Sequence, residues 1–296
     1  MEPDEPGRNS DNSHASIFPV FVLGSARSGT TWLANLLASH PQITAVTGEV
    51  HFGIHESHLF SHTRYCFDET VDCRNFFERY SAEDYYKLAG VDWKEICEGD
   101  NRTESVVYWF RRLMEAKAQR EDKRHWLEKT PKHCIYCPEI FREFPNAKYV
   151  LIEREFKTAV QSNLTKYARA GVNRWAQIAE KAFRYESDRK ALDWLKKQPT
   201  GCLVSVKYED LRRDQEEQIS RIERALGIDI IPLESQFQRD SSYKRGDKYP
   251  MGTVDWMLAY AVKWAVALMP LKWIRRIRIK RDLPGAQVFP KYTRVD

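Results

Sequence analysis

The residues with the clearest chemistry form a short run of small, hydroxyl and basic side chains, Gly24-Ser-Ala-Arg-Ser-Gly-Thr-Thr31. Small residues let backbone N–H groups converge on an anion, and a helix that starts at Thr30 adds unsatisfied N–H groups and the positive end of its dipole. Arg27 supplies a permanent positive charge. The run therefore predicts an anion-binding loop. The residues assigned to it are Arg27, Ser28, Gly29, Thr30, Thr31 and Trp32.

The glycine spacing of this loop helps to define the anion. Gly24 and Gly29 stand at the spacing of the nucleotide triphosphatase pattern G-x-x-x-x-G-K-[ST]. Thr30 occupies the place of the lysine that holds the β- and γ-phosphates. The loop therefore argues against ATP or GTP chemistry. A P-loop nucleotide kinase or hydrolase remains an alternative that a magnesium requirement would favour.

A second group of polar residues follows the apolar run Tyr149–Ile152. Arg154 stands at the end of this predicted strand, and Ser162 lies eight residues later on the helix that should follow. A guanidinium at a strand end and a hydroxyl on the next helix can hold one phosphate from two sides. Arg154 could equally form a surface ion pair with Glu153 or Glu155.

The string R-S-G-T-T-W-L resembles the 5′-phosphosulfate loop of the sulfotransferases that use 3′-phosphoadenosine-5′-phosphosulfate (PAPS). This resemblance implies that the loop cradles the 5′-phosphate and sulfate of PAPS. It also implies that Arg154 and Ser162 bind the 3′-phosphate, although Glu155-Phe156 stands where the family usually has Asp-Pro. Arg27 replaces the Lys of cytosolic small-molecule members. The loop therefore looks more like the carbohydrate, tyrosylprotein and bacterial branches.

Two weaker segments resemble the same family. Val206-Lys-Tyr-Glu-Asp-Leu211 is similar to a segment in which a tyrosine, here Tyr208, lies near the adenine. Ser242-Tyr-Lys-Arg-Gly246 is similar to a late loop over the 3′-phosphate, which implies that role for Lys244, Arg245 and Gly246. A core tyrosine and a solvated turn are the ordinary alternatives for these two segments. The resemblance covers about residues 17–49 and 125–250.

Sulfuryl transfer also needs a cation near the bridging oxygen and a base for the acceptor. Lys129 is the first candidate cation, since it follows a short predicted strand and Glu-Lys-Thr-Pro resembles a sulfate-contacting segment of carbohydrate-type members. Lys132 is the reserve. Glu49 is the candidate base, because a Gly-Glu string carries the base in the tyrosylprotein branch, although the alignment needs one extra residue. His51 is the alternative base.

The elements that must position these residues follow from hydrophobic periodicity. Apolar runs predict strands over 17–23, 43–46, 125–128, 147–152 and 202–206, and helical spacing predicts helices over 30–39, 104–119, 135–144, 156–169, 174–197 and 215–226. Their alternation predicts an α/β fold with a mostly parallel sheet. We expect a P-loop-like three-layer sandwich over 17–250 with a helical insertion at 50–120. Residues 1–16 are predicted to be a flexible tail.

Composition restricts the partners. The chain of 296 residues has a net charge of +5, which favours anionic ligands without requiring nucleic acid. Residues 251–296 form an amphipathic basic extension that either covers the domain or lies on an anionic membrane. The acceptor class, whether carbohydrate, lipid or small molecule, is not encoded in any motif. A PAP-binding protein without catalysis is the second alternative function.

The cysteines and the N-terminal residues indicate the cellular compartment in which the protein is expected. The first 16 residues lack the basic and apolar regions of a secretory signal, so reduced thiols in a cytoplasm are the default expectation. If that default fails, Cys66 and Cys73 are the expected pair. The cluster His133-Cys-Ile-Tyr-Cys137 has no fourth ligand in a second Cys-x-x-Cys, so no metal is expected.

Overall fold

A five-stranded parallel sheet forms the centre of the computed structural model, which describes residues 17–48, 53–62, 70–79, 85–234 and 248–282. The strand order is β2-β5-β1-β6-β7, and each neighbouring pair runs parallel. The strands are β1 (Phe18–Leu23), β2 (Ile43–Ala45), β5 (His125–Glu128), β6 (Lys148–Glu153) and β7 (Cys202–Lys207). All five correspond to apolar runs that predicted strands, and the predicted α/β class is confirmed.

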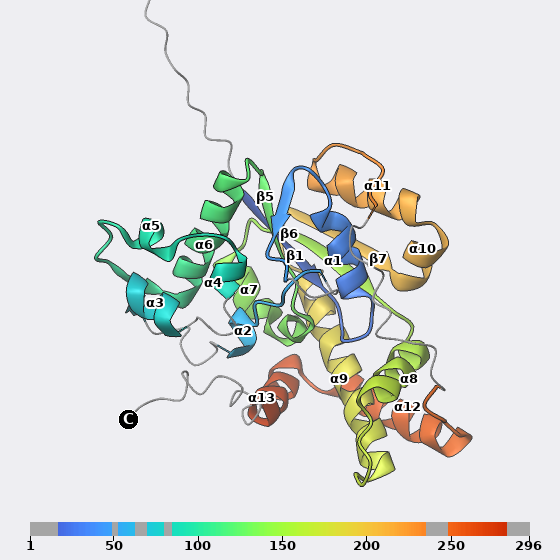
Figure 1. Ribbon diagram of the computed structural model, residues 1–296. Helices are drawn as coiled ribbons and strands as arrows, with labels where there is room; N and C mark the ends of the chain where they lie inside the picture. The colour runs from blue at the N-terminus through green and yellow to red at the C-terminus, as the bar shows by residue number, and fades with distance from the viewer. Residues whose placement is uncertain (1–16, 49–52, 63–69, 80–84, 235–247, 283–296) are drawn as a thin grey trace, which may run out of the picture.

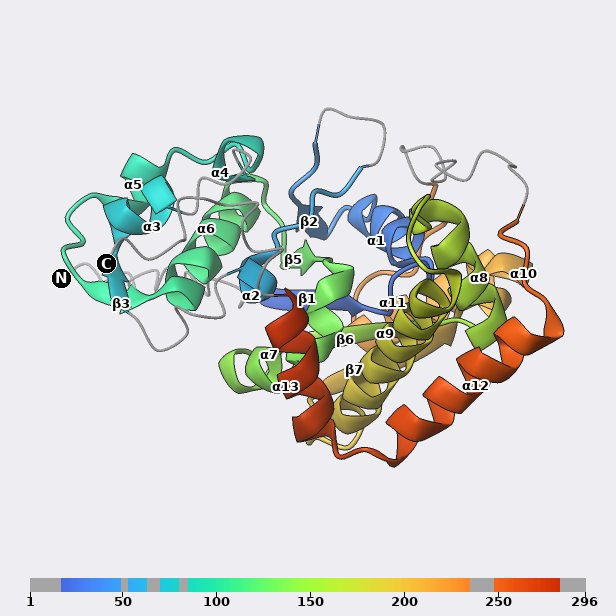
Figure 2. The same ribbon diagram turned by 90° about the horizontal axis from the view of Figure 1, so that it is seen from below.

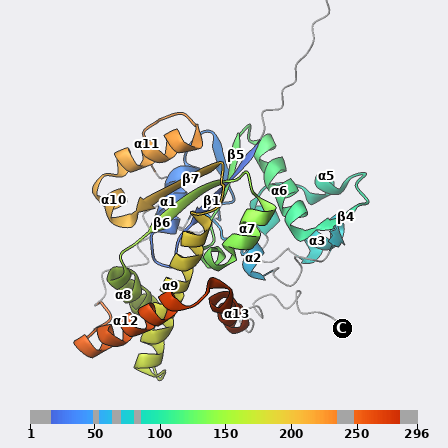
Figure 3. The same cartoon turned by 180° about the vertical axis from the view of Figure 1, so that it is seen from behind.

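Helices cover both faces of the sheet, which makes the three layers visible in Figures 1 and 3. Successive side chains of a strand point to opposite faces. Phe21 and Leu23 of β1 pack in one core, and Val20 and Val22 pack in the other. The first core is shared with α6 (Val106–Arg120), α7 (Cys137–Glu143) and α9 (Arg174–Leu195). The second is shared with α1 (Thr30–Ala38), α10 (Tyr208–Arg213) and α11 (Gln215–Leu226).

The segment after β2 builds a small helical lobe beside the β2–β5 edge of the sheet (Figure 1). Its elements are α2 (Leu59–His62), β3 (Thr70–Asp72), α3 (Cys73–Arg79), α4 (Tyr85–Leu88), α5 (Trp93–Cys97) and β4 (Thr103–Ser105), followed by α6. Strands β3 and β4 pair antiparallel, and a disulfide joins Cys73 to Cys97.

The disulfide corrects one expectation from the sequence. Cys73 pairs with Cys97 of α5, so pairing of Cys73 with Cys66 is wrong, and Cys66 itself lies outside the described residues. The reason is spatial, because α3 and α5 pack together although 24 residues separate the two cysteines. The expectation of reduced thiols fails for this pair. The cytoplasmic location that rested on it stays a prediction.

One helix differs from its prediction by periodicity. The helix expected over 135–144 is divided into a 3₁₀ helix, η2 (Pro131–Tyr136), and α7, because Pro138 fits only the first turn of a helix. The C-terminal extension contains α12 (Thr253–Leu268) and α13 (Leu271–Asp282), separated at Pro270. Figure 2 shows α12 lying along α9, and α8 (Phe156–Tyr167) packs against both helices, since Phe156 contacts Tyr260 of α12.

Candidate active site

The predicted anion-binding loop connects β1 to α1 at the carboxyl edge of the sheet, where open parallel sheets bind ligands. Arg27 and Gly29 have positive φ values of 70° and 97°. A Cβ on Gly29 would lie 2.6 Å from the Tyr208 ring, so only glycine fits this turn. The buried Ser28 hydroxyl donates to the Ser25 carbonyl at 2.6 Å. Ser28 therefore shapes the loop from within.

The side chains predicted to bind the 3′-phosphate and the adenine meet on one side of this loop. The Arg27 Nε donates to the Ser162 hydroxyl at 3.4 Å, and a guanidinium nitrogen of Arg154 donates to the Arg27 carbonyl at 2.8 Å. The Arg154 guanidinium also lies 4.2 Å from the centre of the Tyr208 ring. The Trp32 ring meets Tyr208 edge-on. Residues from β1–α1, β6–α8 and β7–α10 thus form one cationic and aromatic cluster.

Lys129 lies on the other side of the loop, directly after β5. Its ammonium group donates to the Thr31 hydroxyl at 3.2 Å and to a Glu56 carboxylate oxygen at 2.8 Å. The Lys129 side chain is only 2% exposed, whereas that of Glu56 is 32% exposed. The ammonium group is thereby held at the start of α1, beside the loop.

A buried carboxylate fixes the segment that carries Lys129. Glu128 accepts hydrogen bonds from the hydroxyls of Ser57 and Thr130, both at 2.7 Å, and contacts His133 Nδ1 at 2.9 Å. Burial alone would raise the pKa of Glu128, but these interactions outweigh it and lower the pKa to about 2. The ionised Glu128 joins residues 57 and 128–133, so Lys129 and Glu56 are set on one rigid support.

Sequence reasoning missed Glu56 and His58, which border this part of the site. His58 Nε2 lies 3.5 Å from Glu56 Oε2, and His58 has a φ of 52°. Burial lowers the pKa of His58 to about 4, against the opposing effect of the Glu56 charge, so His58 is neutral near pH 7. Strained residues such as Arg27 and His58 concentrate at functional sites. Residues 53–58 have no helical or strand periodicity that could have drawn attention to them.

Five predicted site residues cannot be placed. Glu49, His51, Lys244, Arg245 and Gly246 lie outside the described residues. Their assignments therefore stay predictions. Thr47 and Ile54, on either side of residues 49–52, form an antiparallel bridge. The Ile54 amide donates to Asn35 of α1. The residues on both sides of 49–52 therefore lie close to α1.

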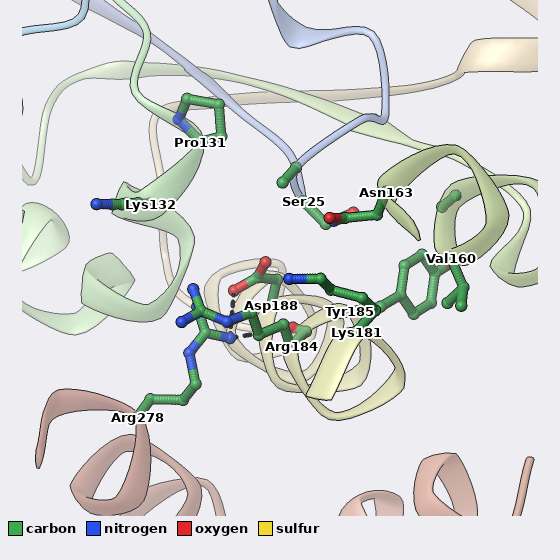
Figure 4. A pocket seen from close by; sticks show the side chains of 12 residues that line it. Ser25, Pro131, Lys132, Val160, Asn163, Lys181, Arg184, Tyr185, Asp188 and Arg278 are labelled. Carbon is green, nitrogen blue, oxygen red and sulfur yellow. Dashed lines mark hydrogen bonds and ion pairs between the residues drawn. The ribbon is translucent and has the colours of Figure 1, made fainter. Parts of the chain in front are cut away.

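Lys132 lies away from the Lys129 contacts, beside a cavity of about 50 Å³ (Figure 4). The cavity lies between the loop, η2, α8, α9 and α13, and Asp188 forms an ion pair of 3.2 Å with Arg278 on its wall. Further lining residues include Ser25, Asn163, Lys181, Arg184 and Tyr185. The exposed Lys132 extends away from the ion pair in Figure 4. Lys132, the second candidate cation, therefore lacks, among the described residues, the kind of hydrogen bond that ties Lys129 to Thr31.

The cysteines of the His133–Cys137 cluster are buried and free. Burial raises the pKa of both thiols, which keeps them protonated. His133 is engaged with Glu128 and accepts from the Phe60 amide. Within the described ranges, no group of three or more His, Cys, Asp or Glu side chains is arranged to hold a metal ion.

Comparison with known proteins gives a family for this arrangement. Residues 19–232 match the model of the sulfotransferase family. The sulfotransferase domain from the curacin biosynthetic pathway has a TM-score of 0.50 at 17% identity, with 83% of this chain and 97% of that chain covered. The sulfotransferase domain of the Synechococcus PCC 7002 olefin synthase has a TM-score of 0.51 at 16% identity, with 87% and 98% covered. These likenesses show the fold. No curated protein sequence matches significantly.

Proposed function

The chain belongs to the sulfotransferase family, and from that premise we propose that it transfers a sulfuryl group from PAPS to a hydroxyl or amine acceptor. The observation that carries the proposal is the meeting of two phosphate-binding elements. The β1–α1 loop and the Arg154–Ser162 element touch through Arg27, 3.4 Å from the Ser162 hydroxyl. One nucleotide with phosphate groups at both its 5′ and 3′ positions would occupy both elements.

Each group has a defined task in this proposal. Backbone N–H groups at the start of α1, together with Thr30 and Thr31, bind the 5′-phosphosulfate. Arg154 and Ser162 bind the 3′-phosphate, and Tyr208 stacks against the adenine. Arg27 lies between the two phosphate positions. These tasks are supported by the contacts that join Arg27 to Arg154 and Ser162, and by the position of these groups after β1 and β6.

The proposed reaction is a single in-line displacement. The acceptor oxygen forms a bond to sulfur as the bond between sulfur and the 5′-phosphate oxygen breaks, and PAP leaves with the bonding electron pair. Lys129 stabilises the charge that develops on the leaving oxygen, because its ammonium group already lies beside Thr31 at 3.2 Å. The acceptor proton passes to a carboxylate or an imidazole.

Glu49 is the proposed base, with His51 as the alternative. Glu56 is a third candidate, favoured by its distance of 2.8 Å from Lys129. Glu49→Gln and Glu56→Gln test the two carboxylates, since each change removes basicity and keeps shape. We expect Glu49→Gln to lower turnover by about 10²–10⁴-fold with PAP binding retained. A normal rate in Glu49→Gln with loss in Glu56→Gln would assign the base to Glu56.

The donor assignment is tested by thermal unfolding with PAP or ATP and no metal. A ligand that binds the folded state alone raises the melting temperature by mass action. PAP should give a clear increase and ATP a much smaller one, since ATP has no 3′-phosphate for Arg154 and Ser162. Equal shifts would contradict the 3′-phosphate site. A shift that appears only with ATP and magnesium would favour the nucleotide kinase or hydrolase.

Transfer itself is tested with sulfate-labelled PAPS and a mixed extract of carbohydrates, lipids and small molecules. Label in an acceptor, lost in Lys129→Ala, supports the sulfotransferase. PAP binding without any transferred label would instead favour a binding protein without catalysis. The labelled fraction also identifies the acceptor class.

A further inference from the structure

Helix α12 carries an uninterrupted apolar row on its outward face. The row follows helical spacing, and its large members are strongly exposed, with Leu268 at 86% and Trp264 at 64%. Its members are Val254, Met257, Ala261, Trp264, Ala265 and Leu268, which we call the α12 stripe. Single exposed apolar residues are ordinary, but a contiguous row marks an interaction surface.

The α12 stripe is bordered by positive charge. Lys263 and Lys157 lie against rings on the flank of α12 that faces α8. Beyond Pro270, the exposed residues within 271–279 of α13 are Lys272, Trp273, Arg276 and Ile277. The acidic residue within α12, Asp255, is buried and paired with Arg174. The surface thus combines apolar side chains, tryptophans and cations.

The inward sides of both helices are firmly attached to the domain, so the stripe is a fixed outer surface. The Lys190 ammonium group on α9 donates to the Ala267 carbonyl at 2.6 Å, which closes the C-terminal end of α12. Arg278 of α13 is buried in its ion pair with Asp188 of α9. Figure 3 shows α12 and α13 on the outside of α9. A rotation that buried the stripe would break both attachments.

We propose that the α12 stripe, together with Lys272 and Arg276 of α13, docks on an anionic lipid bilayer, with α12 lying in the plane of the membrane surface. Helices with this composition insert their apolar face into the headgroup region, and tryptophan prefers that depth. Lysine and arginine near the surface add attraction to anionic lipids. Within the described residues no single helix is long and apolar enough to cross a bilayer. The pair Thr253–Leu268 and Leu271–Ile279 reaches that length and apolar composition only when taken together, and the two segments are bent by 118°, which suits a pair lying on the surface.

The proposal is independent of sulfuryl transfer and is tested without PAPS. The full chain is sedimented with vesicles of phosphatidylcholine and phosphatidylglycerol, and with vesicles of phosphatidylcholine alone. We expect binding to the mixed vesicles, weaker binding to the neutral ones, and loss of binding at high salt, since salt screens charge attraction. The double variant Trp264→Ala/Leu268→Ala should weaken binding by about tenfold or more. Lys272→Glu/Arg276→Glu should abolish the preference for anionic vesicles.

Matched controls lie near α11, on the far side of the molecule from α12 (Figure 1). Ile230→Ala removes a residue that is 56% exposed, and Arg224→Glu reverses an exposed charge, and neither should change vesicle binding. Absence of the full chain from mixed vesicles at low salt would overturn the proposal. An equal loss of vesicle binding in the control variants would also overturn it. Sedimentation analysis that finds a dimer, dissociated by Trp264→Ala/Leu268→Ala, would assign the stripe to a second copy and also overturn it.

Discussion

Lys129 carries a charge whose position is fixed by its neighbours. Its side chain is almost fully buried, and its ammonium group is bound by Thr31 and Glu56. The adjacent Glu128 is locked by Ser57, Thr130 and His133. An ammonium group fixed in this way need not reorganise when charge develops on a leaving oxygen. Arg154 differs in its partners, which include the Arg27 carbonyl and the Tyr208 ring.

We therefore expect Lys129→Ala and Arg154→Ala to impair different steps. Lys129→Ala should mainly lower kcat, since its charge matters most in the transition state, whereas Arg154→Ala should mainly weaken PAP binding. Steady-state kinetics and PAP-dependent thermal shifts separate the two effects. Lys132→Ala is the matched control and should leave both quantities near those of the parent. Normal kcat in Lys129→Ala would transfer the role to Lys132 or Arg27.

His125 gives the molecule a defined sensitivity to acid. Its side chain is buried in β5, and burial, aided by the Lys148 charge, lowers its pKa to about 4. The unfolded chain binds a proton near pH 6.5, so the folded state binds fewer protons below that value. Stability is therefore complete above pH 6.5 and falls as pH decreases toward 4. His125 should account for about 3 kcal/mol of that loss at most.

The measurement is the free energy of unfolding by urea at several pH values. His125→Asn should show a shallower decrease between pH 6.5 and 4 than the parent chain does. Parallel curves for the two proteins would contradict the assignment. His58 also has a lowered pKa, so part of the decrease should remain in the variant.

At the residue scale, the sequence predicted the location of those candidate side chains that directly follow a strand. Arg154, Tyr208 and Lys129 each follow an apolar run, and parallel strands bring such positions to one edge. Glu56 could not be found in this way. It lies in an irregular segment and reaches Lys129 only because Ser57 is held by Glu128, a contact across 71 residues.

The β1–α1 turn is the element on which the proposed phosphate site depends. Ala26 to Gly29 turn through two positive φ values, and the helix then starts at Thr30 without a capping side chain. The start of a helix presents backbone N–H groups and the positive end of its dipole, which favour an anion there. Apolar periodicity predicted the strands well because β1, β2, β5 and β6 are largely buried on both faces and β7 is buried on one. It misjudged 135–144, which is divided between η2 and α7, because Pro131 and Pro138 each start a separate turn.

Gly29→Ala is expected to abolish donor binding. The added methyl group would lie 2.6 Å from the Tyr208 ring and would strain a φ of 97°, so the loop or Tyr208 must move. Gly227→Ala is the matched control, since Gly227 also has a positive φ but a methyl group there would meet no atom within 4 Å. Both variants should lose about 1 kcal/mol of stability from backbone strain. Only Gly29→Ala should lose the PAP-dependent thermal shift, and retention of that shift would contradict the close fit.

The whole molecule is a rigid sandwich with a side lobe at the β2–β5 edge and a helical pair, α12–α13, on the α9 side. The order of strands and helices made the sandwich predictable. The lobe was not predictable in detail, because its helices are short and its strands have three residues each. Its disulfide depends on the packing of α3 against α5, which spacing along the chain does not reveal.

The lobe should depend on its disulfide. The cross-link closes a loop with a sequence separation of 24, and removal of such a cross-link costs about 3 kcal/mol through the entropy of the unfolded chain. Cys73→Ser should therefore unfold at lower temperature, and reductant should lower the melting temperature of the parent chain to a similar value. Reductant should not change Cys73→Ser further. A parent chain insensitive to reductant would show that the bond is absent or without effect on stability.

The contact between Arg27 and Ser162 spans 135 residues, and that between Lys129 and Thr31 spans 98. No partly folded intermediate that lacks β5 or β6 can therefore contain the assembled pocket. Ligand occupancy would be coupled to complete folding, and amide hydrogen exchange would slow across β1, β5 and β6 together. A bound nucleotide would thus stabilise the sheet only once folding is complete. The cellular supply of the sulfate donor would then govern how long the folded protein resists proteolysis.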